Sequence, residues 1–520
     1  MKKLLLGLAV VLLTVRGVAA GAAELPAGVG DDKIKTKTTE VPKAEQSVTQ
    51  HKISIGGATF TYTATAGTRI VRDAKDQPYA RIGYTAYTCS DATDPARRPL
   101  TFAWNGGPGS SSIWLHMGAL GPRRIVTTDA AFTPPPPYRT VDNESSILDK
   151  TDIVLIDPVG TGFSKAVGEA KDADFHGVDP DIESISRFIR QYVTENGRWN
   201  SPKYLLGESY GTTRAAGIVD YLFENENLAI NGLILIGLAT DNDVIENVFS
   251  DDPRFHPFSI PFTLPSYAAV AWFHQALPDR PAELGPFLDE ARAFALGDYT
   301  QALALGNNLQ DDERRRIIGR LHQYTGLSEE YLDRADLRVG VWQFMKELLR
   351  GRGEAVGGYD GRFLGAGLNP LGEIAVYDPS YSAIAPAFSA AFLDYLHRDL
   401  GAPPDRTYVV FASVWNTWNF RHKVPGTEVP QPVVNTGVDL AHAMSMNPQL
   451  RVLVLQGLYD LATPLLATEY MVSHLNLPKD SRSHIEIKYF EAGHMLYLHE
   501  PSLKAFKGDV ATFIAKTSGQ

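Results

Sequence analysis

One serine of the chain stands in a setting suited to nucleophilic chemistry. Ser209 is the centre of the segment Gly-Glu-Ser-Tyr-Gly at 207–211, which lies between a short apolar run and a helical pattern over 212–224. A nucleophile on a sharp turn from strand to helix has strained backbone angles, and flanking glycines let the chain pass close by. The helix start also favours developing negative charge. This context predicts a serine nucleophile, with a plain turn as the alternative.

Two residues further along the chain are suited to activate this serine. A serine hydroxyl is a weak nucleophile, so it needs a histidine base that a carboxylate holds in the right tautomer. In α/β-hydrolase folds the acid and then the histidine follow the serine, each in a loop after a strand. Asp460 and His494 meet these conditions and complete the predicted triad with Ser209. The competing residues are expected to be surface or capping residues: His474, His484, His499, Asp439 and Asp480.

A glycine-rich segment earlier in the chain is suited to bind an oxyanion. The sequence Trp-Asn-Gly-Gly-Pro-Gly-Ser-Ser-Ser occupies 104–112, directly after an apolar run. Two backbone amides aimed at one point stabilise a tetrahedral oxyanion, and we assign this role to the amides of Gly107 and Tyr210. A phosphate cradle is the alternative, but no lysine stands in the position that a P-loop requires.

The elements that must position these residues follow from the hydrophobic pattern. Short apolar runs separated by helical stretches are typical of parallel βα units. They predict an α/β fold with a mixed, mostly parallel sheet flanked by helices. The expected strands are 100–104, 152–156, 204–206, 233–236, 451–456 and 485–489. Two alternating segments, 58–64 and 81–88, predict antiparallel strands at the sheet edge.

The strand pattern stops between two of these runs and helical periods replace it. We expect a helical cap at 242–405, inserted between the two parts of an α/β core at 51–241 and 406–520. The alternative is an ordinary second half of one domain. The expected helices are 267–277, 282–304, 312–324, 342–349 and 383–400.

The N-terminus has the pattern of a secretory signal peptide. Two lysines, an apolar run and a stretch of small residues predict a signal at 1–22, followed by a flexible arm at 23–50. The apolar run is shorter than the roughly 20 residues that span a bilayer. Export to the periplasm or the medium is therefore expected, without stable membrane insertion once the signal is removed. An uncleaved anchor is the alternative.

The composition excludes several classes of function. The net charge of −11, without a basic run, argues against nucleic-acid binding. Cys89 is the only cysteine, so no intrachain disulfide can form, and its surroundings do not resemble those of a catalytic cysteine. No metal-binding motif is present, and triad chemistry requires no cofactor.

Taken together, these segments resemble the serine carboxypeptidase family. The likeness extends from about residue 100 to the end of the chain and indicates a secreted, bacterial-type member. It implies an α/β-hydrolase fold with an inserted helical cap. It also implies removal of C-terminal residues from peptides through an acyl-enzyme. The shared segments, in order, are 104–112, Asp-Pro-Val-Gly-Thr-Gly-Phe-Ser at 157–164, 207–211, Asp460 and Gly-His-Met at 493–495.

The resemblance further implies how a free C-terminal carboxylate is bound. It assigns this role to Asn105, the amide of Gly106 and Glu208, whose carboxyl can donate to a carboxylate only while protonated. Many relatives place a second glutamate shortly after the glycine-rich segment, where this chain has Ala119. The missing acid predicts activity displaced toward neutral pH, or weaker carboxylate recognition. Comparing pH profiles with an Ala119→Glu variant tests this hypothesis.

Other functions remain open for the same residues. The triad would also serve an esterase, an aminopeptidase or an acyltransferase, and the scaffold could belong to a non-catalytic binding protein. The complete set of triad residues and the glycine-rich segment favour an enzyme, because drift without catalysis seldom preserves all of them.

Overall fold

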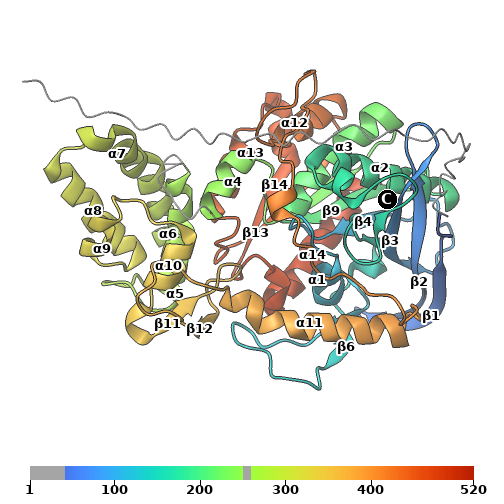
Figure 1. Ribbon diagram of the computed structural model, residues 1–520, viewed down its shortest axis with the longest axis horizontal. Helices are drawn as coiled ribbons and strands as arrows, with labels where there is room; N and C mark the ends of the chain where they lie inside the picture. Colours follow the sequence, from blue (N-terminus) through green and yellow to red (C-terminus); the bar gives the residue numbers. More distant parts are fainter. Residues whose placement is uncertain (1–40, 250–258, 520) are drawn as a thin grey trace, which may run out of the picture. The chain divides into compact units, whose positions relative to one another are not determined.

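A sheet of ten strands organises the part of the chain that the structure describes, residues 41–249 and 259–519 of a computed structural model (Figure 1). Its strands are β1 (Gln46–Ile55), β2 (Ala58–Arg72), β3 (Pro78–Cys89), β4 (Leu100–Trp104), β7 (Asp152–Ile156), β8 (Lys165–Ala166), β9 (Lys203–Glu208), β10 (Gly232–Ile236), β13 (Arg451–Gly457) and β14 (Ile485–Phe490). Their order is β1-β2-β3-β7-β4-β9-β10-β13-β14, with β8 paired to β3.

The direction of the strands confirms the predicted mixed sheet. From β7 through β4, β9, β10 and β13 to β14 every neighbouring pair is parallel. The pairs β1–β2, β2–β3 and β3–β7 are antiparallel. All eight strands expected from the sequence are present. This order brings the C-terminal ends of β4, β9, β13 and β14 to one edge of the sheet, where loops that carry function gather.

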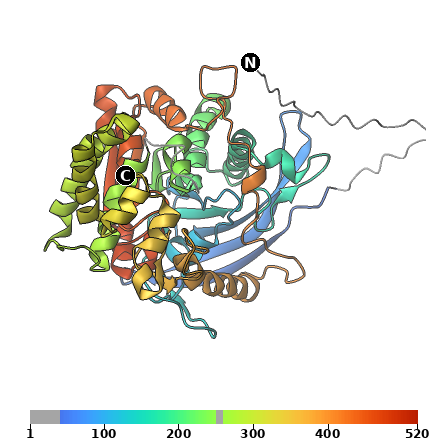
Figure 2. The same cartoon turned by 60° about the vertical axis from the view of Figure 1, so that its left-hand side comes forward.

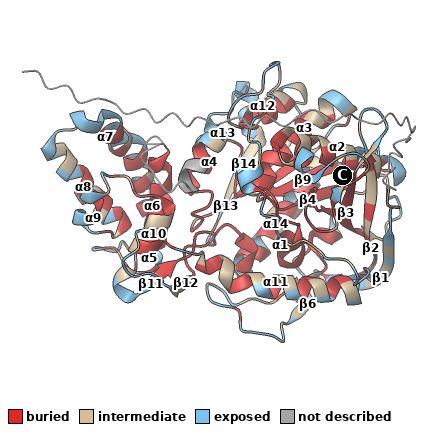
Figure 3. Cartoon of the chain, in the orientation of Figure 1, coloured by how far each residue is buried: buried red, intermediate tan, exposed pale blue. Residues whose placement is uncertain are grey.

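The central strands are buried throughout because helices cover both faces of the sheet. Every residue of β4, β7, β9 and β10 is buried (Figure 3). Successive side chains point to opposite faces: Phe102 joins one hydrophobic cluster with α2 (Val178–Glu195) and α3 (Tyr210–Glu226), whereas Ala103 joins the other with α14 (Glu500–Thr517).

Strand β1 differs from the prediction. The arm expected at 23–50 gives way to β-structure at Gln46, and β1 pairs with β2 along its whole length. Among the hydrophobic residues of β1, only Ile53 and Ile55 are fully buried. The apolar alternation is therefore too weak to identify a strand from sequence. Backbone pairing with β2 stabilises the segment instead.

The expected signal peptide at 1–22 and most of the arm lie outside the described residues. Within residues 41–249 and 259–519, no helix combines the length and the apolar character needed to cross a bilayer.

The segment between β10 and β13 is largely helical, as expected. It contributes no strand to the ten-stranded sheet in its described part. Its helices α5 (Leu264–Phe273), α6 (Leu284–Phe294), α8 (Asp311–Thr325) and α10 (Val341–Glu347) lie together near β13, with β1 and β2 at the opposite edge of the sheet (Figure 1, Figure 2). A small hairpin of β11 (Glu354–Val356) and β12 (Leu364–Ala366) was not predicted.

The last long helix of the expected insertion packs against the core. Helix α11 (Pro379–Arg398) lies inside the predicted insertion, yet it contacts α1 (Ile113–Leu115) and β5 (Arg123–Ile125) of the core. Phe388 and Phe392 of α11 are buried in the cluster that covers one face of the sheet. The chain from Glu40 to Gln520 forms a single compact unit, so the helices do not separate as a domain.

Candidate active site

Ser209 lies at the turn between β9 and α3. Its backbone has φ 60° and ψ −132°, a conformation that costs energy for a residue with a side chain. The amide of Ser209 donates to the carbonyl of Ile236 at 2.9 Å, and its own carbonyl accepts from the amide and the hydroxyl of Thr212, both at 2.7 Å. A Cβ at Gly207 would lie 2.1 Å from the oxygen of Gly211. Glycine is therefore required there, and the strained turn is fixed on both sides.

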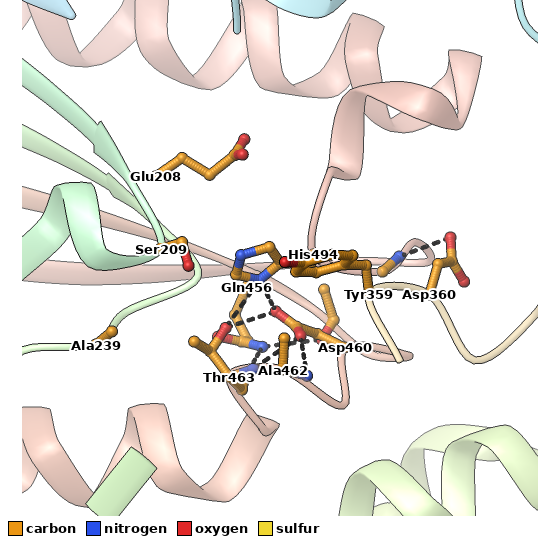
Figure 4. A network of polar contacts seen from close by, with 12 residues as sticks. Glu208, Ser209, Ala239, Tyr359, Asp360, Gln456, Asp460, Ala462, Thr463 and His494 are labelled. Atoms are coloured by element: carbon orange, nitrogen blue, oxygen red, sulfur yellow. Dashed lines mark hydrogen bonds and ion pairs between the residues drawn. The ribbon is translucent and has the colours of Figure 1, made fainter. Parts of the chain in front are cut away.

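Asp460 and His494 form a buried hydrogen-bonded pair just after the ends of β13 and β14 (Figure 4). Nδ1 of His494 lies 2.7 Å from Oδ2 of Asp460. The carboxylate also accepts from the amides of Ala462 and Thr463, at 2.8 and 2.9 Å, and from the hydroxyl of Thr463 at 2.6 Å. A proton on Nδ1 satisfies this carboxylate and leaves Nε2 as the acceptor, the tautomer of a general base.

The charge on His494 is set by two opposing effects. Burial disfavours the imidazolium, but the attraction and the hydrogen bond of Asp460, together with the charges of Glu208 and Asp378, outweigh burial, so the pKa of His494 is raised. The imidazolium that would form during proton transfer is thereby stabilised.

Gly237 lies between the segment that anchors the Ser209 turn and the imidazole of His494. This glycine follows Ile236, the residue that accepts the Ser209 amide, and has φ +59°. A Cβ on Gly237 would lie 2.7 Å from Cε1 of His494, so only glycine allows this approach. Figure 4 shows the ring between Ser209 and Asp460. Nε2 of His494 is buried and has no hydrogen-bond partner among the described residues.

A segment of the insertion, 357–363, positions His494 and was not identified from the sequence. The amide of His494 donates to the carbonyl of Tyr359 at 2.6 Å, and the two rings stack with centroids 5.4 Å apart. The amide of Gly493 donates to Oδ2 of Asp360 at 3.2 Å. Arg362 in turn holds the Asp360 carboxylate at 2.7 Å. Neither periodicity nor a motif marks this segment, because its role arises from contacts with distant loops.

The residues assigned to a substrate carboxylate lie together beside Ser209. Nδ2 of Asn105 donates to Oε1 of Glu208 at 2.8 Å, and its Oδ1 accepts from the amide of Leu115. Glu208 is buried, and burial raises its pKa to about 7 against the opposing effects of His494, Tyr497 and Asn105. Glu208 therefore holds its proton up to about neutral pH, as a donor to a carboxylate must.

The glycine-rich segment lies against the start of α3. A Cβ on Gly106 would lie 2.5 Å from the amide nitrogen of Tyr210. Gly107 has φ +106°, which favours glycine. The indole of Trp104 donates to the carbonyl of Gly211 at 2.8 Å and fixes the two segments to each other. The amides assigned to the oxyanion thus belong to adjoining segments.

The competing acids and histidines have other partners. Asp480 lies in a short 3₁₀ helix at Lys479–His484. Across residues 41–249 and 259–519, no group of three or more His, Cys, Asp or Glu side chains is arranged to hold a metal ion. Of the other competing residues, His474 contacts Tyr470, His484 contacts Arg451, His499 contacts Ser502 and Asp439 contacts His422.

The chain is similar to known serine carboxypeptidases over part of its length. A family model described as serine carboxypeptidase matches residues 83–265. Pheromone-processing carboxypeptidase KEX1 of Saccharomyces cerevisiae (strain ATCC 204508 / S288c) is 32% identical over 149 residues, which cover 26% of this chain and 19% of the yeast protein. Serine carboxypeptidase-like 36 of Arabidopsis thaliana is 29% identical over 155 residues, covering 29% of this chain and 30% of the plant protein. The chain thus matches less than a third of either relative's length.

The fold is shared over a longer stretch. The crystal structure of Kex1(delta)p, a prohormone-processing carboxypeptidase from Saccharomyces cerevisiae, superposes with a TM-score of 0.55 at 14% identity. The superposition covers 87% of this chain and 91% of that chain. The family match includes the glycine-rich segment and Ser209, whereas Asp460 and His494 lie beyond it. Residues 83–265 thus match the serine carboxypeptidase family, and the chain has the α/β-hydrolase fold.

Proposed function

We propose that the chain is a serine carboxypeptidase that removes C-terminal residues from peptides. The observation that carries this proposal is the position of three groups: the strained Ser209, the His494–Asp460 pair, and the buried Glu208 beside them. The first two supply a nucleophile with its base, and the third supplies a donor for a free carboxylate. The match of residues 83–265 to the serine carboxypeptidase family supports the same chemistry.

The proposed reaction runs in two steps. Ser209 Oγ attacks the carbonyl carbon of the last peptide bond while Nε2 of His494 takes the hydroxyl proton. The amides of Gly107 and Tyr210 stabilise the tetrahedral oxyanion. The imidazolium, stabilised by Asp460, returns the proton to the leaving amine, and an acyl-enzyme remains. His494 then activates water, which releases the shortened peptide and restores Ser209.

Substrate selection depends on a free C-terminus in this proposal. Asn105, the amide of Gly106 and the protonated Glu208 bind the terminal carboxylate. An ionised Glu208 would repel that carboxylate, and the raised pKa of Glu208 avoids this repulsion at and below about neutral pH.

Three substrates test the proposal. The purified protein is incubated with an N-blocked dipeptide that has a free C-terminus, with the same dipeptide amidated, and with a simple ester. We expect hydrolysis of the free acid to exceed that of the amide, and none by a Ser209→Ala variant. Hydrolysis of the ester alone would indicate an esterase. No reaction with any substrate, and none with a serine-directed phosphonate, would indicate a binding protein.

We also propose that the chain is exported. The lysine pair, apolar run and small residues at the N-terminus support this. Mass spectrometry of the mature N-terminus after expression in a secreting host provides the test. Cleavage within residues 20–23 is expected, whereas an intact Met1 in the exported fraction would indicate an uncleaved anchor.

A further inference from the structure

Three buried polar atoms, one in Glu208 and two in the segment 494–497, have no hydrogen-bond partner among the described residues. They are Nε2 of His494, Oε2 of Glu208 and Oη of Tyr497. Buried polar groups are nearly always hydrogen-bonded. A buried group without a partner at a functional site therefore suggests that it binds a ligand or takes part in catalysis. The mechanism uses the first two atoms. It gives Tyr497 no role.

Tyr497 packs against the residue that precedes Ala119. It lies in the short helix η11 (Leu496–Leu498), three residues after His494, and η11 packs against η1 (His116–Leu120). A Cβ on Gly118 of η1 would lie 2.3 Å from the Tyr497 ring. Only glycine therefore leaves room for this ring. The next residue is Ala119, where the resemblance to serine carboxypeptidases implies a second glutamate in many relatives.

The Tyr497 hydroxyl and the Glu208 carboxyl act on each other. Tyr497 opposes the burial that raises the pKa of Glu208, while burial and Glu208 together raise the pKa of Tyr497 well above its usual value. Yet neither Tyr497 Oη nor Glu208 Oε2 has a hydrogen bond of normal geometry. The two groups are close enough to interact, and each keeps bonding capacity for a third partner. Tyr497 keeps its proton and can donate it.

We propose that the Tyr497 hydroxyl is a hydrogen-bond donor of the carboxylate site and replaces the second acidic group that is missing at Ala119. This inference rests on the proposed function. A terminal carboxylate would accept from Asn105, the Gly106 amide, the protonated Glu208 and the Tyr497 hydroxyl. A phenol adds a donor without the negative charge that a second glutamate could bring. The other titratable groups that act on Glu208 are His494 and Asp460.

Two separate tyrosine-to-phenylalanine variants test the inference. Tyr497→Phe removes only the hydroxyl and keeps the ring that packs against Gly118. Tyr79→Phe is the matched control, because Tyr79 is a tyrosine of β3 whose buried hydroxyl also has no partner among the described residues. Calorimetry measures binding of N-acetyl-phenylalanine and of its amide to the full chain and both variants. Steady-state kinetics with the blocked dipeptide acid and the simple ester accompany it.

The expected result is specific to the free acid. Tyr497→Phe should bind N-acetyl-phenylalanine about tenfold more weakly than the unchanged chain, the loss expected for one hydrogen bond to a charged group. Its KM for the dipeptide acid should rise by a similar factor, with kcat and ester hydrolysis within about twofold. Tyr79→Phe should match the unchanged chain.

Two results would overturn the inference. One is equal affinity of Tyr497→Phe and the unchanged chain for the acid. The other is an unchanged chain that binds the acid no better than the amide, since a carboxylate site would then be absent. If the chain binds the acid through Tyr497 but hydrolyses no free-acid peptide, the proposed function fails and the carboxylate site stands.

Discussion

At the scale of single residues, the proposed reaction needs a histidine that has lost its proton and a glutamate that has kept its own. Asp460 fixes the His494 tautomer and raises the histidine pKa, so His494 needs a higher pH to become a free base. Burial keeps Glu208 protonated up to about pH 7. Activity on free-acid peptides therefore requires a pH at which His494 has lost its proton and Glu208 has not, which predicts a narrow optimum.

Replacing Glu208 should reveal the cost of burying its charge. The folded pKa of about 7 exceeds the ordinary 4.5, so the folded state binds more protons between these values. The free energy of unfolding therefore falls as pH rises from 4.5 to 7. Glu208→Gln removes this penalty. Urea unfolding should show the variant equal to the unchanged chain below pH 4.5 and up to about 3 kcal/mol more stable above pH 7.

The control for this measurement is Glu428→Gln, which alters an exposed carboxyl and should produce no such pH-dependent difference. A Glu208→Gln curve that runs parallel to that of the unchanged chain at every pH would show that Glu208 has no raised pKa.

Asp460→Asn should disable the base while preserving the fold. The carboxylate accepts hydrogen bonds from Ala462, Thr463 and His494, and an amide nitrogen placed there would face those donors. Loss of the correct tautomer is expected to lower kcat by about 10⁴-fold. Asp439→Asn is the control, since it alters another Asp–His pair, and its kcat should be unchanged. Comparable kcat in both variants would exclude Asp460 from the triad.

At the scale of elements, the sequence predicts what depends on local pattern and misses what depends on distant contacts. Buried strands such as β4 and β10 are almost entirely apolar, and the Ser209 turn has its own glycine signature. Strand β1 has little apolar alternation, so only its pairing with β2 reveals it. The segment 357–363 contacts Gly493, and Tyr497 contacts Gly118. Both partners are more than a hundred residues away in sequence, and no local pattern marks such contacts.

The segment 357–363 provides the prediction at this scale. Asp360 accepts from the Gly493 amide and from Arg362, whose side chain is buried. Asp360→Asn leaves Arg362 without its buried counter-charge, which typically costs about 3–5 kcal/mol. It also loosens the loop that carries His494. Chemical denaturation should show this loss, and kcat should fall more than KM rises.

Asp129→Asn is the matched control, because Asp129 pairs with Arg362 at 3.3 Å from a half-exposed position. Its cost should stay below about 1 kcal/mol. If the two variants were equally stable and equally active, Asp360 would have no positioning role.

At the scale of the whole unit from Glu40 to Gln520, one hydrophobic cluster joins the core to the helical insertion. It contains Ile182 of α2 and Val219 of α3 together with Val270 of α5 and Phe344 of α10. A continuous core of this kind couples the stability of its parts, because neither half can unfold without exposing apolar surface of the other. The insertion should therefore not melt by itself.

Phe344→Ala tests this coupling. Phe344 is fully buried and stacks on Tyr267 with ring centroids 3.9 Å apart, so its truncation should cost about 3–5 kcal/mol. In thermal unfolding followed by far-UV circular dichroism and by tryptophan fluorescence, the unchanged chain should give one coincident transition. The variant should give one transition at a lower Tm for both probes. Leu371→Ala, at a residue that is 93% exposed, should leave Tm unchanged. Two separate transitions, with only the earlier one moved by Phe344→Ala, would show that the insertion unfolds independently and that the site can lose Tyr359 and Asp360 while the sheet stays folded.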